Sequence, residues 1–184
     1  AIDVRDWFRR MPWRRGASPV TLAPEYEEYL FEQWEHGVFD DYWKQLGIYA
    51  EGFYDQYVDA AMVHMSSWYD AYARTATDNY IGLSKRKRGP VRLIMGPWTH
   101  GDRQLTYVGD VDFGPAATLD GNVATDFASL RARWFDRWLK DVRNGVDDEP
   151  PVRIFVMGGG SGRKSSAGRL DHGGRWRSER DWPI

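Results

Sequence analysis

The segment Val91-Arg92-Leu93-Ile94-Met95-Gly96-Pro97-Trp98-Thr99-His100-Gly101 joins a short apolar run to a loop that carries a histidine. A similar segment lies earlier in the chain, where the apolar run Ala60 to Met65 is followed by Ser66-Ser67-Trp68-Tyr69-Asp70. Both runs have the length and composition of buried strands, and residues 71–83 between them have a helical pattern. A strand, a helix and a second strand joined by short connections predict the parallel strands of an α/β fold. Each strand then places one ionisable side chain at the sheet edge where α/β proteins build their sites.

The composition of the 184 residues argues against several classes of partner. The 25 basic and 27 acidic residues nearly balance, so the net charge of −2 gives no reason to expect nucleic acid or an anionic membrane. The absence of cysteine excludes disulfides and thiolate zinc sites and leaves the redox compartment undetermined. No stretch approaches the roughly 20 apolar residues of a membrane span. We expect a soluble protein, in the cytoplasm rather than secreted, and leave open whether it forms a homo-oligomer.

The first residues and the aromatic content both suggest a piece of a larger protein. Residues 1–6 lack the charged-then-apolar pattern of a signal peptide and do not begin with Met, so we expect a processed or truncated start. The chain has 10 Trp, 10 Tyr and 8 Phe, although its mean hydropathy is only −0.65. Aromatic side chains fill cores or line binding surfaces. In so polar a chain we expect some of them to face a partner, a ligand or a missing part of the protein.

The region before the first strand has helix signals and no convincing strand. Pro24 and the acidic residues that follow it suit the start of a helix, and Tyr26, Leu30 and Trp34 then recur along one face. A second short helix is expected from about Asp40 onwards. We interpret this region as a helical cap rather than as part of a sheet.

The region after His100 contains one strong helix and one further strand. The helix is predicted over residues 127–139 from apolar positions at three- and four-residue steps, and Asn144-Gly145 is expected to end it. Residues 147–151 have the composition of a linker, and residues 152–157 alternate like a half-buried strand. The tail from Gly158 onwards is rich in glycine and arginine and cannot form a core by itself.

Asp70 and His100 are the candidate catalytic residues. A carboxylate can orient a histidine by accepting its Nδ1 proton, and histidine exchanges a proton near neutral pH. An acid followed by a histidine matches the last two members of the hydrolase order Ser, Asp, His. Each residue also has an ordinary structural interpretation: a carboxylate directly before a helix is favoured as an N-cap, and a loop histidine can simply bond to backbone. Taken alone, Asp70 fits the cap better than it fits catalysis.

The other histidines have weaker claims to a role in catalysis. His64 lies within the first strand and is expected to be a hydrogen-bonded core residue. His36 lies between two expected helices, and His172 lies in the glycine-rich tail.

A metal site is the chemical competitor of the acid–histidine pair. It would combine His100, Asp102 and Asp70, but no second histidine stands at a diagnostic spacing. We therefore expect neither a metal nor another cofactor. The basic run Lys85 to Arg88 is interpreted as a solvated loop rather than as a nucleic-acid patch.

No serine in the chain is a credible nucleophile for this pair. Gly159-Gly160-Ser161-Gly162-Arg163 approaches the pattern Gly-x-Ser-x-Gly but fails at its last position and follows the histidine in the chain. Ser66 and Ser67 belong to the loop of the acid itself. We expect the nucleophile to lie outside these residues.

Several segments carry a family resemblance in their order along the chain. They are His36-x-x-x-Asp40-Asp41-Tyr42-Trp43, Ser66-Ser67-Trp68-Tyr69-Asp70, Gly96-Pro97-Trp98-Thr99-His100-Gly101, Asp112-Phe113-Gly114, Arg133-Trp134-Phe135-Asp136-Arg137-Trp138-Leu139-Lys140 and Pro150-Pro151-Val152-Arg153-Ile154-Phe155-Val156-Met157-Gly158. Together they resemble the cocaine esterase and X-prolyl dipeptidyl aminopeptidase family of α/β-hydrolases. The family pattern before the acid usually has two glycines where this chain has Ser66 and Ser67.

The resemblance implies a fold, an activity and roles for two residues. It implies a helical cap segment in residues 1–48, the C-terminal part of an α/β-hydrolase domain in residues 49–146, and a linker with the first strands of a jelly-roll β-sandwich in residues 147–184. It also implies hydrolysis of a small ester or peptide substrate by a serine enzyme, with Asp70 as the triad acid and His100 as the triad histidine. Because the family's nucleophile lies upstream of the matching segments, we expect this chain to be inactive alone. The alternative from another class is a non-catalytic, aromatic-rich binding or interaction module.

Overall fold

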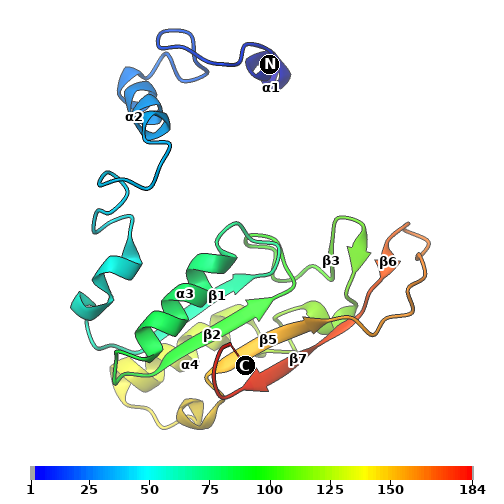
Figure 1. Ribbon diagram of the computed structural model, residues 1–184. Coiled ribbons are helices and arrows are strands. Elements are labelled where there is room, and N and C mark those ends of the chain that lie inside the picture. Colours follow the sequence, from blue (N-terminus) through cyan, green and yellow to red (C-terminus); the bar gives the residue numbers. More distant parts are fainter. Residues whose placement is uncertain (1–2, 184) are drawn as a thin grey trace. The chain divides into compact units, whose positions relative to one another are not determined.

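The computed structural model describes residues 3–183 and divides the chain into two compact units, residues 1–52 and 53–184. The first unit contains helices α1 (Val4–Arg9) and α2 (Pro24–Glu35), and the second contains all the strands (Figure 1). A 3-10 helix, η1 (Ala50–Gln56), runs across the boundary. Within the described residues, no helix is long and apolar enough to cross a membrane.

The first unit is held by contacts between α2 and the loop that precedes it. Pro24 occupies the start of the helix, as the sequence predicts. The carboxylate of Glu27 accepts hydrogen bonds from the hydroxyl of Ser18 at 2.6 Å and from the N–H of Gly16 at 2.8 Å. The ring of Trp34 packs against the ring of Trp13, with centroids 5.7 Å apart. These contacts fix the loop against one side of α2.

The short helix expected from Asp40 does not form, and that prediction is wrong. Residues 41–48 form a series of turns instead. The carboxylate of Asp40 accepts the N–H of Tyr42 at 3.0 Å and lies 2.6 Å from Nδ1 of His36. Aspartate that bonds to backbone two residues on favours a turn over a helix, which explains the difference.

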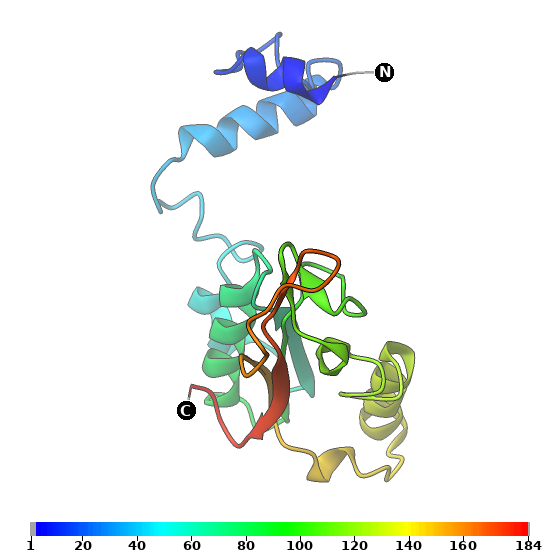
Figure 2. The ribbon, with the colours of Figure 1, turned by 90° about the vertical axis from the view of Figure 1, so that its right-hand side faces the viewer.

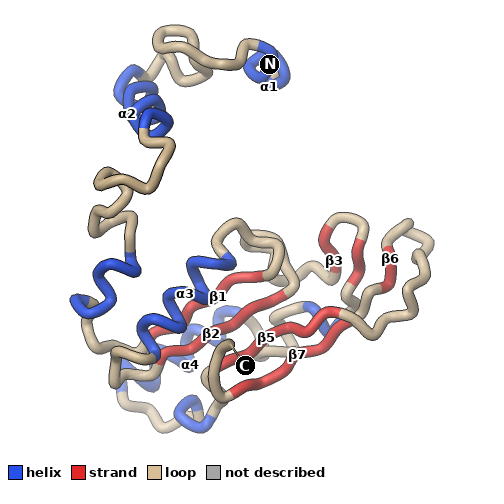
Figure 3. Tube along the Cα trace, in the orientation of Figure 1, coloured by secondary structure: helices blue, strands red, loops and turns tan. Residues whose placement is uncertain are grey.

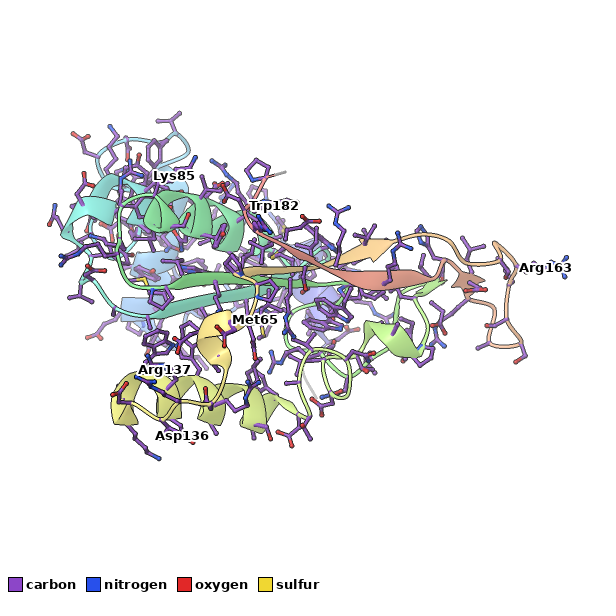
Figure 4. All side chains as sticks on the ribbon, turned by 90° about the horizontal axis from the view of Figure 1, so that it is seen from below. Met65, Lys85, Asp136, Arg137, Arg163 and Trp182 are labelled. Atoms are coloured by element: carbon purple, nitrogen blue, oxygen red, sulfur yellow. The ribbon has the colours of Figure 1, made fainter. Side chains whose placement is uncertain are left out.

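The second unit is built on a four-stranded sheet in the order β1-β2-β5-β7. The strands β1 (Met62–Ser67), β2 (Val91–Gly96) and β5 (Val152–Met157) are parallel, and β7 (Gly174–Glu179) runs antiparallel to β5. Helix α3 (Ala73–Ser84) connects β1 to β2, and helix α4 (Phe127–Lys140) lies in the connection from β2 to β5. Figure 2 shows α3 and α4 on opposite sides of the sheet, and Figure 4 shows the same arrangement with the sheet seen along its edge.

Side chains of the strands point alternately to the two faces of the sheet, so both faces offer apolar residues to the helices. Met65 points from β1 towards α4 (Figure 4), and with Phe127 it packs on a cluster that includes Ile94 and Trp98. Leu93 and Met95 in β2 are fully buried. A central parallel strand covered on both faces is expected to be largely apolar, and β2 is apolar except for Arg92.

A second, smaller sheet extends from the loops after β2 and β5 (Figure 3). It contains β3 (Tyr107–Val108), β4 (Val111–Asp112) and β6 (Leu170–Asp171), and short 3-10 helices η2 (Pro115–Ala117) and η3 (Val146–Asp148) lie in the connections. Strands of two residues are too short to show an alternating pattern, and they were not predicted from the sequence.

The expected α/β fold, with parallel strands and flanking helices, is confirmed. The predicted strands over residues 60–65, 91–95 and 152–157 form, with ends shifted by at most two residues. The helix over 127–139 also forms, but its expected end at Asn144-Gly145 is wrong: α4 ends at Lys140, and Asp141 takes the left-handed cap conformation that was expected of a glycine. The strands β5 and β7 extend the same sheet as β1 and β2. The β-sandwich expected from residue 147 and the cap role of residues 1–48 stay predictions.

Candidate active site

The loops that follow β1 and β2 lie side by side because the two strands end in register. Ser67 pairs with Gly96, which makes them the last residues of the parallel ladder. Beyond that point the N–H of Trp68 donates to the carbonyl of Gly96 at 2.9 Å, and the N–H of Tyr69 donates to the carbonyl of Trp98 at 3.2 Å. The backbone pairing therefore continues into the loops that carry the two candidate residues.

Each loop is anchored by a tryptophan whose indole N–H finds a distant carbonyl. Trp68 donates through Nε1 to the carbonyl of Phe155 in β5 at 2.7 Å. Trp98, only 2% exposed, donates to the carbonyl of Ala117 at 2.7 Å. Buried indoles usually need such a partner, so these bonds fix the direction of both rings. Each anchor lies within two residues of the candidate acid or the candidate histidine.

Asp70 and His100 form a hydrogen-bonded pair. Nδ1 of His100 lies 3.0 Å from Oδ2 of Asp70. The other carboxylate oxygen, Oδ1, accepts the backbone N–H of Tyr72 at 2.9 Å. The Asp70 side chain is 7% exposed and the His100 side chain is 75% exposed. The pair thus has a sheltered acid and a histidine that reaches into solvent.

The surroundings of Asp70 favour its charged form. Burial alone would raise its pKa, but the hydrogen bonds from the Tyr72 N–H and from His100 outweigh this cost and hold the pKa of Asp70 below its usual range. A carboxylate that is ionised at neutral pH can accept the Nδ1 proton and so fix Nε2 of His100 as the free basic nitrogen.

The N-cap interpretation of Asp70 does not describe the structure. Helix α3 begins at Ala73, its N-cap residue is Tyr72, and no side chain caps it. Asp70 instead closes a turn two residues long through the Tyr72 N–H, which leaves Oδ2 for the histidine. The carboxylate is therefore a turn acceptor and a histidine partner at once.

A hollow of about 340 Å³ lies beside the pair, between β1 and α3. Its lining includes His64, Asp70, Asn79 and His100. The expectation that His64 is a hydrogen-bonded core residue is wrong: its Nε2 is buried and has no hydrogen-bond partner within residues 3–183. Burial lowers the pKa of His64, so its imidazole is neutral near pH 7.

The remaining candidate residues lie in other surroundings. His36 pairs with Asp40 in the first unit, and the ring of His172 packs on Phe113 at 5.7 Å between centroids. The hydroxyl of Thr99 donates to Asp102 at 2.5 Å. Among the described residues there is no group of three His, Asp or Glu side chains arranged to hold a metal ion.

Neither Ser67 nor Ser161 is placed to act as the nucleophile of this pair. Ser67 is buried, and its hydroxyl donates to the carbonyl of Thr99 at 3.4 Å. Ser161 lies in the connection between β5 and β6, where its backbone N–H is bonded to Asp171 at 2.9 Å. An apolar groove of about 330 Å³ lies between the sheet and α4, and neither Asp70 nor His100 lines it.

One residue of the site was not singled out in the sequence. Tyr72 contacts both members of the pair, through its N–H to Asp70 and through its ring to His100, with ring centroids 5.4 Å apart. The spacing Asp70-x-Tyr72 is the signal that could have found it, because a side-chain acceptor in a turn bonds the N–H two residues on.

The acid and the histidine are thus paired at the carboxyl ends of adjacent parallel strands, the edge of an α/β sheet where such proteins build their sites. The family model for the X-Pro dipeptidyl-peptidase (S15 family) matches residues 3–102. The chain belongs to this family, and the matched residues include both Asp70 and His100.

Individual relatives agree with this assignment. The chain is 32% identical over 113 residues to cocaine esterase from Rhodococcus sp. (strain MB1 Bresler), a match that covers 58% of the chain and 17% of that enzyme. Two crystal structures of a CocE/NonD family hydrolase from Staphylococcus aureus share the fold with TM-scores of 0.52 and 0.51, at 18% and 17% identity. Each match covers 85% of this chain and 22% of the hydrolase. The chain thus spans about a fifth of the length of these relatives.

Proposed function

We propose that this chain supplies the acid and the histidine of a serine hydrolase that cleaves a small ester or an X-Pro peptide substrate. The observation that carries the proposal is the 3.0 Å contact between Nδ1 of His100 and Oδ2 of Asp70. Membership of the X-Pro dipeptidyl-peptidase family and the similarity to cocaine esterase support both substrate classes.

The proposed chemistry is acyl transfer. Nε2 of His100 takes the proton of a serine hydroxyl as its oxygen attacks the carbonyl carbon, and Asp70 stabilises the imidazolium that forms. His100 then gives this proton to the leaving alcohol or amine. In the second half, His100 deprotonates a water molecule that attacks the acyl-enzyme, and the serine is released with its proton restored.

We further propose that the serine lies outside these 184 residues. The serines near the pair are on the strand of the acid, and the Ser67 hydroxyl is already bonded to Thr99. Acid and histidine without the nucleophile retain only the small rate that binding and polar groups supply. The chain alone is then inactive.

The first experiment treats the isolated chain with a fluorophosphonate probe, which reacts with activated serines. We expect no labelling above that of the His100→Ala variant. Labelling that depends on His100 would contradict the proposal that the nucleophile lies elsewhere.

The second experiment uses a longer polypeptide that contains both these residues and a fluorophosphonate-reactive serine. Hydrolysis of p-nitrophenyl butyrate and of Gly-Pro-p-nitroanilide is measured, with Gly-Ala-p-nitroanilide as the control for proline specificity. We expect His100→Ala to lower kcat by about 10³-fold or more, as loss of a triad member does. Undiminished turnover would remove His100 from the reaction.

The competing function is binding through exposed aromatic side chains in the first unit. Trp34 is half exposed, but its ring lies at 33° to Trp13 and at 77° to Phe31. A flat stacking platform needs coplanar rings, and this cluster does not provide one. The paired acid and histidine therefore favour the hydrolase.

A further inference from the structure

His100 needs more than its bond to Asp70 to hold a fixed orientation. Its side chain is 75% exposed, so few neighbouring atoms restrict its rotamers. The hydrogen bond to Asp70 fixes the distance of one ring nitrogen from the carboxylate. It leaves the imidazole free to tilt about that contact, and a side chain in solvent gains entropy by leaving it.

The ring of Tyr72 gives His100 a second contact. The two rings meet at 67°, edge to face, with centroids 5.4 Å apart. This geometry is one of the two favoured arrangements for aromatic pairs. Tyr72 is itself 61% exposed, so its ring is not needed to fill the core.

The backbone of Tyr72 acts on the other member of the pair. Its N–H donates to Oδ1 of Asp70 at 2.9 Å, which turns Oδ2 towards His100. Tyr72 is also the N-cap residue of α3, so its backbone is held by a helix that packs on β1 and β2. A single residue on a rigid element thus touches the acid and the histidine.

We propose that Tyr72 is a positioning residue for the pair: its N–H orients the carboxylate of Asp70, and its ring holds the imidazole of His100 with Nδ1 towards that carboxylate. The importance of this for catalysis rests on the proposed hydrolase function. The contact itself is a property of this chain and can be measured without turnover.

The side chain and the backbone of Tyr72 have separate roles in this proposal. A side-chain substitution removes the ring contact and keeps the backbone bond to Asp70. The carboxylate then stays in place while His100 loses its second contact. Phenylalanine keeps the ring and removes only the hydroxyl, so it preserves the function of the residue.

The test is nuclear magnetic resonance of the ¹⁵N-labelled histidine rings in the 184-residue chain at about pH 8, where an ordinary imidazole is neutral. The ¹⁵N shifts report which ring nitrogen carries the proton, and a His100→Gln variant assigns the signals. In the wild type we expect the proton of His100 on Nδ1, because that nitrogen faces Asp70. We also expect nuclear Overhauser contacts between the rings of Tyr72 and His100.

In Tyr72→Ala and in Tyr72→Leu, we expect the equilibrium between docked and undocked His100 to shift about two- to tenfold towards the undocked form, the range for loss of one aromatic pair. Tyr72→Phe is expected to match the wild type. The matched control is Tyr69→Ala, since Tyr69 is an exposed neighbour whose ring packs on Phe113 and not on His100. His36, which pairs with Asp40, is an internal reference in every spectrum.

A Tyr72→Ala or Tyr72→Leu variant that folds and leaves the His100 tautomer and ring position unchanged would overturn the proposal. So would an equal effect of Tyr69→Ala. Loss of esterase or peptidase activity does not enter this test, so the hydrolase proposal can fail while the positioning role of Tyr72 stands.

Discussion

Ser67 pairs with Gly96, and this pairing makes β1 and β2 end at the same level of the sheet. Asp70 stands three residues beyond Ser67 and His100 stands four beyond Gly96, so the two loops reach the same point from adjacent strands. Parallel strands joined by a helix bring such loops together without any contact between the side chains themselves. The acid–histidine bond therefore depends on the register of the ladder below it.

Gly96→Ala tests how closely the end of β2 packs against the ring of Trp98. A Cβ at position 96 would lie 2.3 Å from the indole ring of Trp98, which is buried and bonded to Ala117. The ring has to move, and the loop of His100 moves with it. We expect a loss of stability of about 1–3 kcal/mol, as for overpacking of a core, measured by urea denaturation.

The matched control for this substitution is Gly37→Ala. Nothing lies within 4 Å of a Cβ built there, and the backbone does not require glycine. We expect its stability to stay within about 0.5 kcal/mol of the wild type. Equal effects of the two substitutions would show that Trp98 is not the reason for glycine at position 96.

Trp68→Phe tests the anchor of the other loop. The substitution keeps an aromatic ring but removes the N–H that donates to the carbonyl of Phe155. We expect a loss of about 1 kcal/mol in the free energy of unfolding, the usual net value of one hydrogen bond. The control is Trp34→Phe, at a half-exposed position in the first unit, where the midpoint of the β-sheet unit should not change.

The stability of the second unit should depend on pH through Asp70. Its pKa is lowered in the folded protein, so its stabilising contribution is fully present above the unfolded-state pKa of about 3.9 and is lost as the pH falls through the folded value. We expect Asp70→Asn to be less stable than the wild type at pH 7, and the difference to shrink below about pH 4. Urea denaturation at several pH values between about 3 and 7 measures this difference in the free energy of unfolding. The control is Asp148→Asn, at an exposed position before β5. A difference that stays constant with pH would exclude the charge of Asp70 as its source.

The elements that the sequence predicted are those whose pattern is local. β2 is a mostly apolar run ended by Gly96-Pro97, and α4 repeats its apolar positions at helical steps, so both elements could be placed from the sequence. The end of α4 could not, because Asp141 and not Gly145 takes the left-handed cap conformation. The two-residue strands β3, β4 and β6 have no room for a pattern, since two residues show no period. The antiparallel pairing of β7 with β5 depends on contacts between distant segments, and composition alone describes β7 as tail.

The residues of the candidate site also fall into those that the sequence could indicate and those that it could not. Asp70 and His100 could be singled out because each follows a strand and has the required chemistry. The role of Tyr72 could not be foreseen, because an aromatic ring before a helix has many uses and only the folded loops bring it to His100. Nε2 of His64, which has no hydrogen-bond partner within residues 3–183, could not be foreseen either, because a strand pattern does not show which side-chain atoms become buried without a partner.

Ion pairs through Glu149 connect α4 to the sheet. Glu149 accepts from Arg92 in β2 at 2.9 Å and lies 2.8 Å from Arg133 in α4. The side chains of Arg92 and Glu149 are 12% and 19% exposed, and burial lowers the pKa of Arg92 while leaving it charged at neutral pH. Glu149→Gln keeps the shape of the side chain but removes the only carboxylate that the described residues place between these arginines.

We expect this substitution to cost about 3 kcal/mol, the lower end of the range for breaking a buried pair, because it leaves arginine charge without a partner in a sheltered place. Urea denaturation at neutral pH measures the loss. The control is Asp78→Asn, which breaks the surface pair with the exposed Arg74 and should cost no more than about 1 kcal/mol. The double variant Arg92→Met, Glu149→Gln separates the causes. Recovery of most of the lost stability would show that the cost arises from the unpaired charge of Arg92, and no recovery would exclude that charge as the source.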